Sequence, residues 1–338
     1  MRLFFVIAFT ACVMACGPVA PGVRAESFRA GALSTPGDPY DVLWQRFATD
    51  IERESDGALT AELMVRGEVG GEEALMLAVR RGRIEMAIFT SSGMSAVVPE
   101  FALLMAPFVF DSLAEADFVL DNYLAEPFAA LAAQKGLTVF GWADEGFQSV
   151  YSVSPLRTPA DAHNYRMRAF QVPSSPLFLT AIGADVAAMP FPDVIPALQT
   201  GLIQGGEAGP MTYASYGLAP VAPYYTLTRH AYSSGVYAAN TDWFESLTPE
   251  LQAALRRAVP SSDEVRDRIR ARNDSDLARV KNGAPDVYEP TPDELRAWRT
   301  ATHDVPQQLV ARIGGSAADI YAVLQRGRAA FRRETHHD

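Results

Sequence analysis

The residues that could carry out chemistry are few, and their spacing matches no common catalytic motif. The sequence has no GxSxG, GxxxxGKS/T, GxGxxG or HExxH pattern, and the stretch around Ser95 lacks the second glycine of a nucleophile elbow. The five histidines are scattered, and His336 and His337 stand at the end of the chain, as expected of a solvated tail. Both cysteines, Cys12 and Cys16, precede the folded part, which can therefore hold no disulfide, thiol nucleophile or cysteine-bound zinc. We expect a binding protein with no cofactor and no metal site; a hydrolase or lyase with an unrecognised site is the alternative.

One run of hydroxyl side chains has the position of a ligand-binding loop. Thr90, Ser91 and Ser92 follow the short apolar run 84–89, which is typical of a buried strand. Their hydroxyl groups can bond to carboxylate or hydroxyl oxygens. One of them could instead be the N-cap of a helix that begins near Gly93. Both interpretations stay open.

Charge and composition exclude some partners. The chain has 338 residues, with 29 Lys and Arg against 40 Asp and Glu, and a net charge of -11 at pH 7. A protein that binds nucleic acid needs a basic surface, so no nucleic-acid partner is expected. Hydrophobic residues make up 49% and charged residues 20%, which indicates a globular protein. One buried arginine could still bind an anion in such an acidic chain.

The segment 1–25 is predicted to be an export signal. A positive start at Arg2 precedes an apolar run over 3–15, which is shorter than the roughly 20 residues that cross a bilayer. Two processing sites compete. One would leave Glu26 as the first mature residue, and a lipoprotein-like box would leave Cys16 lipidated as a membrane anchor.

Strand and helix patterns alternate along the chain and predict an α/β fold. Apolar patterns predict strands over 27–32, 59–63, 84–89 and 137–141. Helical spacing predicts helices over 42–51, 72–81, 262–280, 291–313 and 317–331. Asp56 and Gly57 are expected to terminate the first of these helices. The runs 84–89 and 137–141 are predicted to be buried strands of a parallel sheet.

An ordered set of short motifs fills the middle of the chain. They read YRMRAF (165–170), AMPFPDV (188–194), ALQTG (197–201) and GGE (205–207). In this order and spacing the chain resembles the solute-binding proteins of TRAP (tripartite ATP-independent periplasmic) transporters, the DctP-like family. Members of that family carry R-V-P, P-M-P-F-x-E-V-Y, A-L-Q-T-G and D-G-x-E-N-P segments. Weaker matches extend the resemblance to about residues 27–260.

The resemblance implies an α/β, two-lobed clamshell of the periplasmic-binding-protein (type II-like) kind, with a long connecting helix. It divides the chain into a signal segment (1–25), lobe I (26–145 plus about 234–273) and lobe II (146–233 plus about 274–338). It further implies a periplasmic protein that captures an organic acid anion and delivers it to a permease with a small and a large membrane subunit. A ligand sensor for a membrane receptor would share the same pocket and is a further alternative.

By the same resemblance, Arg168 binds the carboxylate of the ligand. A guanidinium group offers a planar fork of donors that matches a carboxylate with two parallel hydrogen bonds. The simpler alternative for Arg168 is an ion pair with an acid across the cleft. Phe191 has the position of an aromatic residue against the ligand, or packs in the core. Thr90, Ser91 and Ser92 match the ligand loop of the first lobe. Weaker candidates, for which packing is the simpler interpretation, are Gln171 and Tyr213.

Departures from the family pattern change the expected ligand. Many members have Gly-Phe-Arg where this chain has Gly-Phe-Gln, with Gln148 in place of the arginine. The asparagine that follows the glutamate in the family is replaced here by Ala208, which follows Glu207. All three positions are still predicted to contact the ligand. With one arginine missing, a dicarboxylate is disfavoured, and a ligand with one carboxylate and an apolar or hydroxylated body is favoured. Asp144 and Glu145 could meet an amine or a cation, although solvated hinge acids are the simpler interpretation.

Overall fold

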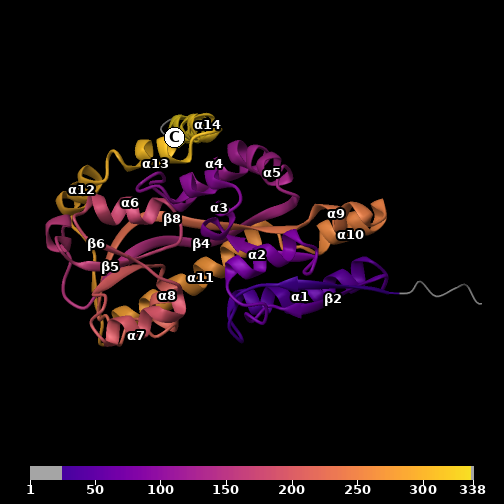
Figure 1. Cartoon of the computed structure of the whole chain (residues 1–338), viewed down its shortest axis with the longest axis horizontal. Helices are drawn as coiled ribbons and strands as arrows, with labels where there is room; N and C mark the ends of the chain where they lie inside the picture. The colour runs from indigo at the N-terminus through magenta and orange to yellow at the C-terminus, as the bar shows by residue number, and fades with distance from the viewer. Residues whose placement is uncertain (1–24, 336–338) are drawn as a thin grey trace, which may run out of the picture.

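Two long antiparallel strands run through the whole molecule. Strand β4 (Leu137–Ser152) pairs with β8 (Tyr224–Asn240) along nearly the full length of both. The computed structural model describes residues 25–335, and Figure 1 shows this pair, which we call the β4–β8 ribbon, running between layers of helices. The other strands join the ribbon near its two ends, so the ribbon links two parts of the protein.

The remaining strands of the described residues are β1 (Glu26–Gly31), β2 (Leu59–Met64), β3 (Met86–Thr90), β5 (Arg166–Ala169), β6 (Asp185–Ala188), β7 (Gly205–Ala208) and β9 (Asp286–Tyr288). Their order across the sheet is β2-β1-β3-β8-β4-β7-β5-β6, and β9 also pairs with β8. β3 pairs with residues 235–239 of β8, whereas β7 pairs with residues 149–152 of β4. These two segments lie at opposite ends of the ribbon because its strands are antiparallel. We call the part built on β1–β3 the first half and the part built on β5–β7 the second half.

The sheet is mixed rather than parallel. β1 is parallel to β2 and β3, and β5 is parallel to β6 and β7, as the alternation of strands and helices predicts. The prediction of a short parallel strand at 137–141 is wrong, because this run is only the beginning of β4, which is antiparallel to both its neighbours. β3 is likewise antiparallel to β8 on one side. Polar residues over 144–149 concealed the continuation of β4, although most of them are buried where the two halves meet.

Helices cover both halves, as Figure 1 shows. They are α1 (Pro39–Glu54), α2 (Glu72–Arg80), α3 (Ser91–Ser95), α4 (Leu113–Val119), α5 (Ala125–Ala133), α6 (Ser174–Ala181), α7 (Val194–Gln199), α8 (Pro210–Ser215), α9 (Thr241–Ser246), α10 (Pro249–Ala258), α11 (Ser262–Lys281), α12 (Pro292–Ala301), α13 (Val305–Ile313) and α14 (Ala317–Thr335). Short 3-10 or π turns are η1 (Pro99–Met105), η2 (Leu120–Leu124), η3 (Pro159–Ala162) and η4 (Phe191–Asp193). The long helix α11 packs on β4, on α1 of the first half and on α8 of the second half.

Most helix boundaries follow their sequence signals. α1 ends where Asp56 and Gly57 adopt φ angles of 52° and 78°, in the left-handed region that stops a helix. The prediction of one helix over 291–313 is wrong, because α12 ends at Ala301 and α13 begins at Val305. Pro306 lies in the first turn of α13, where its missing N–H is tolerated, but it could not continue a helix from α12.

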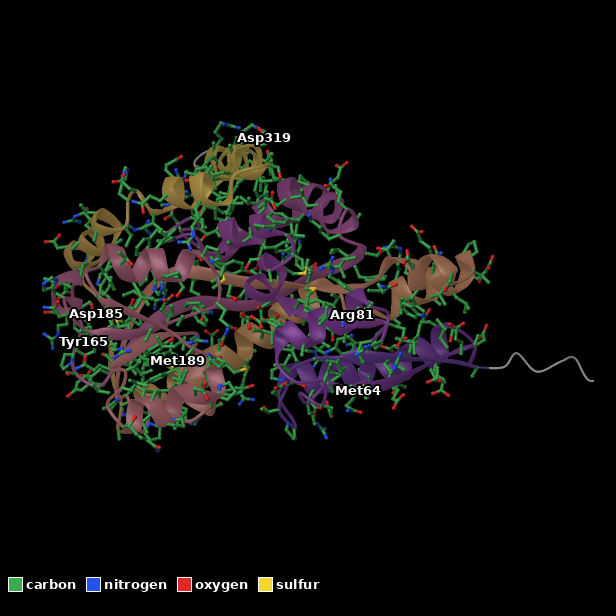
Figure 2. All side chains as sticks on the ribbon, in the orientation of Figure 1. Met64, Arg81, Tyr165, Asp185, Met189 and Asp319 are labelled. Carbon is green, nitrogen blue, oxygen red and sulfur yellow. The ribbon has the colours of Figure 1, made fainter. Side chains whose placement is uncertain are left out.

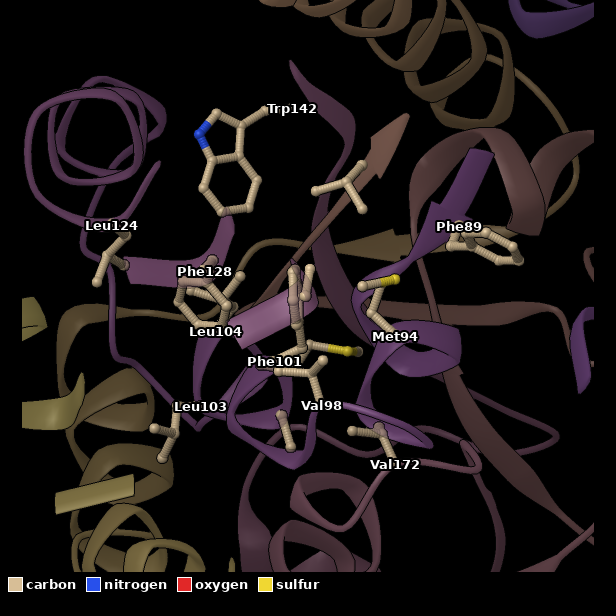
Figure 3. Packing of buried hydrophobic residues seen from close by; sticks show 14 of the residues in the cluster. Phe89, Met94, Val98, Phe101, Leu103, Leu104, Leu124, Phe128, Trp142 and Val172 are labelled. Carbon is tan, nitrogen blue, oxygen red and sulfur yellow. The ribbon is translucent and has the colours of Figure 1, made fainter. Parts of the chain in front are cut away.

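Aromatic residues fill the core beneath α5. The ring of Phe101 lies 4.3 Å from that of Phe128, which in turn lies 5.9 Å from Trp142 at the edge of the ribbon (Figure 3). The same apolar cluster includes Leu324 of α14, and α14 packs against α4 and η2. The C-terminal helix therefore contacts elements within the range predicted for lobe I. The division into lobes stays a prediction.

Candidate ligand-binding site

A cavity of about 370 Å³ lies where the two halves meet the ribbon. This volume is in the range of small-molecule sites. The first half contributes Tyr40, Glu72 and Thr90, the ribbon contributes Glu145, and the second half contributes Arg168. Among the described residues, the charged side chains that line the cavity are Glu72, Glu145 and Arg168.

Arg168 projects from β5, whose register is fixed by parallel pairing with β6 and β7. Arg168 is only 5% exposed, and its Nε donates to the carbonyl oxygen of Met189 at 3.3 Å. Figure 2 places Met189 in the second half, close to β5. The guanidinium carbon of Arg168 lies 4.6 Å from the ring centre of Phe170 and 5.9 Å from that of Phe191.

Arg168 forms no ion pair with any carboxylate of residues 25–335. The alternative interpretation, an ion pair across the cleft, is therefore not what the structure shows. Burial lowers the pKa of Arg168, while the nearby Tyr151 and Glu207 act in the opposite direction. A buried guanidinium without an anion is unfavourable, and a ligand carboxylate would supply the missing partner.

Glu72 lies in the first turn of α2 and reaches towards β3. Its carboxyl oxygens accept hydrogen bonds from the backbone N–H of Thr90 at 2.6 Å and from the Thr90 hydroxyl at 2.9 Å. A Cβ atom at Gly93 would lie 2.2 Å from Glu72 Cδ, so only a glycine leaves room for the carboxyl group in this position. Burial raises the pKa of Glu72 to about 7, against the hydrogen bonds from Thr90 and with the help of the charge of Glu145.

Glu145 lies on β4, next to Asp144. Its carboxyl group accepts a hydrogen bond from the hydroxyl of Ser233 on β8. Burial raises the pKa of Glu145, and the charge of Asp144 acts in the same direction. Asp144 is different, because it is fully buried and its Oδ2 accepts from Arg270 Nε of α11 at 2.7 Å. The interpretation of Asp144 as a solvated hinge acid is therefore wrong.

The ten residues predicted to contact the ligand divide into three groups. Five line the cavity: Thr90, Ser92, Arg168, Gln171 and Phe191. Three line a smaller neighbouring cavity of about 60 Å³, which shares Glu145, Phe170, Phe191 and Thr212 with the first: Gln148, Glu207 and Ala208. Two line neither cavity: Ser91 and Tyr213.

The hydroxyl groups of Ser91 and Tyr213 are used within the fold. Ser91 is fully buried and its Oγ donates to the carbonyl oxygen of Ser234 at 2.9 Å. The hydroxyl of Tyr213 donates to the carbonyl oxygen of Ala222 at 2.9 Å. Thr90 is the N-cap of α3, because its Oγ1 accepts from Gly93 N–H, and it also lines the cavity, so its predicted contact with a ligand stays a prediction.

Glu207 belongs to a buried network in the second half. Its two carboxyl oxygens contact Ser175 Oγ at 2.6 Å and His230 Nε2 at 3.1 Å. Ser175 Oγ in turn accepts from the backbone N–H of Phe170 at 2.9 Å. Glu207 therefore helps to fix the loop that carries Phe170 beside Arg168. Gln148 bonds locally, through Nε2 to the carbonyl oxygen of Gly146 at 3.2 Å.

The sequence interpretation missed several residues of the cavity wall. Tyr40, Glu72 and Tyr216 line the cavity but were not identified. Glu72 resembles any acid in the first turn of a helix, where a negative charge is favourable. Its signal lies 21 positions away in Gly93, whose lack of a side chain makes room for the carboxyl group of Glu72, and only the fold connects the two residues.

Similarity to known proteins shows the family of this chain. The family model for bacterial extracellular solute-binding protein, family 7 (DctP), matches residues 31–312. The chain belongs to this family. Its members are solute-binding proteins of transport systems rather than enzymes, as the motifs predicted.

Named relatives cover most of the chain. The 2,3-diketo-L-gulonate-binding periplasmic protein of Escherichia coli K12 is 29% identical over 72% of this chain and 74% of its own length. The ectoine-binding periplasmic protein of Halomonas elongata is 24% identical over 88% of both chains. A TRAP periplasmic solute-binding protein of Roseobacter denitrificans, solved with bound β-D-glucuronate, superimposes with a TM-score of 0.82. It is 25% identical, and the match covers 90% of this chain and 99% of that one.

The two-lobed α/β fold expected from the motifs is confirmed by this superposition. No helix between residues 25 and 335 is long and apolar enough to cross a membrane. The predicted export signal and the lipid anchor at Cys16 lie outside the described residues.

Proposed function

We propose that this DctP-family protein captures a small organic anion in the periplasm through Arg168. The observation that carries the proposal is the buried guanidinium group, which faces a cavity of about 370 Å³ and forms no ion pair with an acid of the described chain. Buried charges in proteins are normally paired. A carboxylate would complete the pair, with the rings of Phe170 and Phe191 beside it.

The ligand carries one carboxylate near Arg168. Gln148 stands where many relatives have a second arginine. Among the described residues that line the two cavities, Arg168 is the one with a cationic side chain. A second carboxylate would therefore be buried without a cation. Thr90, Ser92 and Gln171 line the same cavity and can hydrogen-bond to the rest of the ligand.

Binding brings the two halves together about the ribbon. A ligand that contacts Arg168 in the second half and Thr90 in the first half stabilises the closed arrangement through contacts that the open one lacks. The loaded protein then delivers the solute to a TRAP-type permease with a small and a large membrane subunit, driven by an ion gradient. Export by the segment 1–25 places the protein in the periplasm.

A hydrolase is disfavoured by the nearest approach to a catalytic triad. Ser175, His230 and Glu207 lie together, but Ser175 Oγ donates to Glu207 rather than to the histidine. All three residues are 3% exposed or less. Ser175 therefore lacks both a hydrogen bond to the histidine and access to a substrate. The pocket would equally suit a ligand sensor. Uptake of labelled solute by cells with and without this gene would distinguish a sensor from a transporter component.

A thermal-shift screen against organic acids tests the proposal. A ligand at a hundredfold excess over its Kd adds about 2.7 kcal/mol to the free energy of unfolding, which is an easily measured increase in Tm. We expect hits among monocarboxylates and none among neutral sugars. A screen in which neutral sugars stabilise the protein and no acid does would contradict the proposal.

A further inference from the structure

Both signs of charge face the cavity without a partner. Arg168 forms no ion pair, although the charge of Glu207 acts on it, and neither Glu72 nor Glu145 forms a salt bridge within residues 25–335. The three side chains form no ion pair with one another; Arg168 comes from the second half, Glu72 from the first half and Glu145 from the ribbon. Acids and arginines are rarely buried unless they are paired. A ligand in the cavity can supply an opposite charge to all three groups.

The two acids form one acidic wall. The charge of Glu145 contributes to the raised pKa of Glu72. It also contributes to the raised pKa of Tyr40 and of Tyr216. All four residues line the cavity. The wall therefore combines two carboxyl groups with two aromatic rings. This is the composition that favours an organic cation, through charge and through the faces of the rings.

Three hydroxyl groups at this wall already donate their protons within the protein. Thr90 donates to Glu72, Ser233 donates to Glu145, and the hydroxyl of Tyr40 donates to the carbonyl oxygen of Asp144 at 2.6 Å. What these groups offer the cavity is oxygen acceptors. A ligand group that only donates, such as an ammonium or amidinium, satisfies them fully. A sugar hydroxyl could donate to one carboxylate, but its own lone pairs would then face the acceptors of the wall.

We propose that the solute is a zwitterion, whose carboxylate binds Arg168 and whose N–H-bearing cation lies between Glu72 and Glu145. This inference rests on the proposed function and narrows it from organic anions in general to one class. The cation offsets the two acids in the same way as the ligand carboxylate offsets Arg168. An anion with a hydroxylated body would leave both acids unpaired in the closed cavity.

Calorimetric titration of the dialysed protein with matched probes tests the inference. The zwitterions are 4-aminobutyrate, 5-aminovalerate and ectoine, and the monoanions with neutral bodies are 4-hydroxybutyrate, 5-hydroxyvalerate and D-glucuronate. We expect a zwitterion to bind more tightly than its hydroxy counterpart. Glu72→Gln and Glu145→Gln should weaken zwitterion binding by about 10- to 100-fold, because one half of a buried charge pair is lost. Glu73→Gln, at the exposed neighbouring position of α2, is the matched control and should change nothing.

The outcomes separate this inference from the proposed function. If D-glucuronate or a hydroxy acid binds best and Glu72→Gln leaves or improves its affinity, the zwitterion is wrong and the binding of an organic anion stands. If none of the acids binds, the proposed function fails and the inference fails with it. The Tm of the ligand-free variant tests whether Glu72 has only a structural role. Glu72→Gln should keep or raise the Tm at pH 8, and a lower Tm with unchanged affinities would overturn the proposal.

Discussion

Asp144 and Glu145 are neighbours on the same strand and have different surroundings. Asp144 points towards α11, where Arg270 binds it through Nε and holds Asp117 with both terminal nitrogens at 2.7 Å. Glu145 points into the cavity and receives one hydroxyl hydrogen bond, from Ser233. Strand β4 thus directs Asp144 towards α11 and Glu145 into the cavity.

The difference separates charges that hold the fold together from charges that are kept for the solute. Around α11 every buried acid or arginine meets an opposite charge, as Arg266 also meets Asp117 at 3.0 Å and Asp121 at 2.6 Å. Around the cavity Arg168, Glu72 and Glu145 meet none within the described chain. Removing a framework charge should therefore reduce stability, whereas removing a cavity charge should reduce binding.

Loss of Arg270 should have the largest effect on stability. Arg270→Ala leaves the fully buried Asp144 without a cation, and breaking such a buried pair costs about 3–5 kcal/mol of unfolding free energy. Urea denaturation measures the loss. Arg268→Ala removes an exposed pair with Glu264 on the same helix and should cost only about 0–1 kcal/mol. Equal effects of the two variants would show that the buried pair stabilises the fold no more than the exposed pair.

The cavity acids should make the empty protein less stable as pH rises. The folded protein raises the pKa of Glu72 from its ordinary 4.5 to about 7, so folding favours the protonated form. Stability is therefore greatest below about pH 4.5 on account of this group and declines until pH passes about 7. The decline is about 1–3 kcal/mol, since a tenfold change in proton affinity corresponds to about 1.4 kcal/mol and the side chain is partly exposed.

Glu72→Gln removes this particular dependence. Thermal melting between pH 5 and pH 8 should show a Tm difference between wild type and Glu72→Gln that grows with pH in favour of the variant. Burial raises the pKa of Glu145 as well, so part of the wild-type decline should persist in the variant. Glu73→Gln is the control. A gap that narrows as pH rises would show that the carboxylate of Glu72 is stabilised by the fold.

Gln148→Ala should have the smallest effect. Its amide donates to the carbonyl oxygen of Gly146 and lines only the smaller cavity, so a neutral hydrogen bond to the ligand is the most that can be lost. We expect affinity to fall by about 0.5–1.5 kcal/mol in a calorimetric titration. A loss as large as that of a buried ion pair would mean that Gln148 has kept the role of the family's arginine.

The sequence predicts the framework of this site better than its acidic wall. Arg168 and Phe191 follow from the ordered motifs, Thr90 follows from the run of hydroxyl residues after the strand at 84–89, and all three line the cavity. Glu72 could not be found in this way, because its role depends on a contact with β3 and on the space left at Gly93. The full length of β4 was also hidden, since its polar middle follows neither a strand pattern nor a helix pattern.

The most direct test of the account is the affinity of Arg168→Ala for the acid that the screen returns. We expect a loss of about 3–5 kcal/mol, or roughly a hundredfold to several thousandfold in Kd, with the fold intact by circular dichroism. Arg168→Lys should also bind poorly, because an ammonium cannot reproduce the two parallel hydrogen bonds. Arg166→Ala, at an exposed position of the same strand, should bind like wild type. If Arg168→Ala binds within about threefold of wild type, which is less than about 1.4 kcal/mol, Arg168 is not the group that holds the anion.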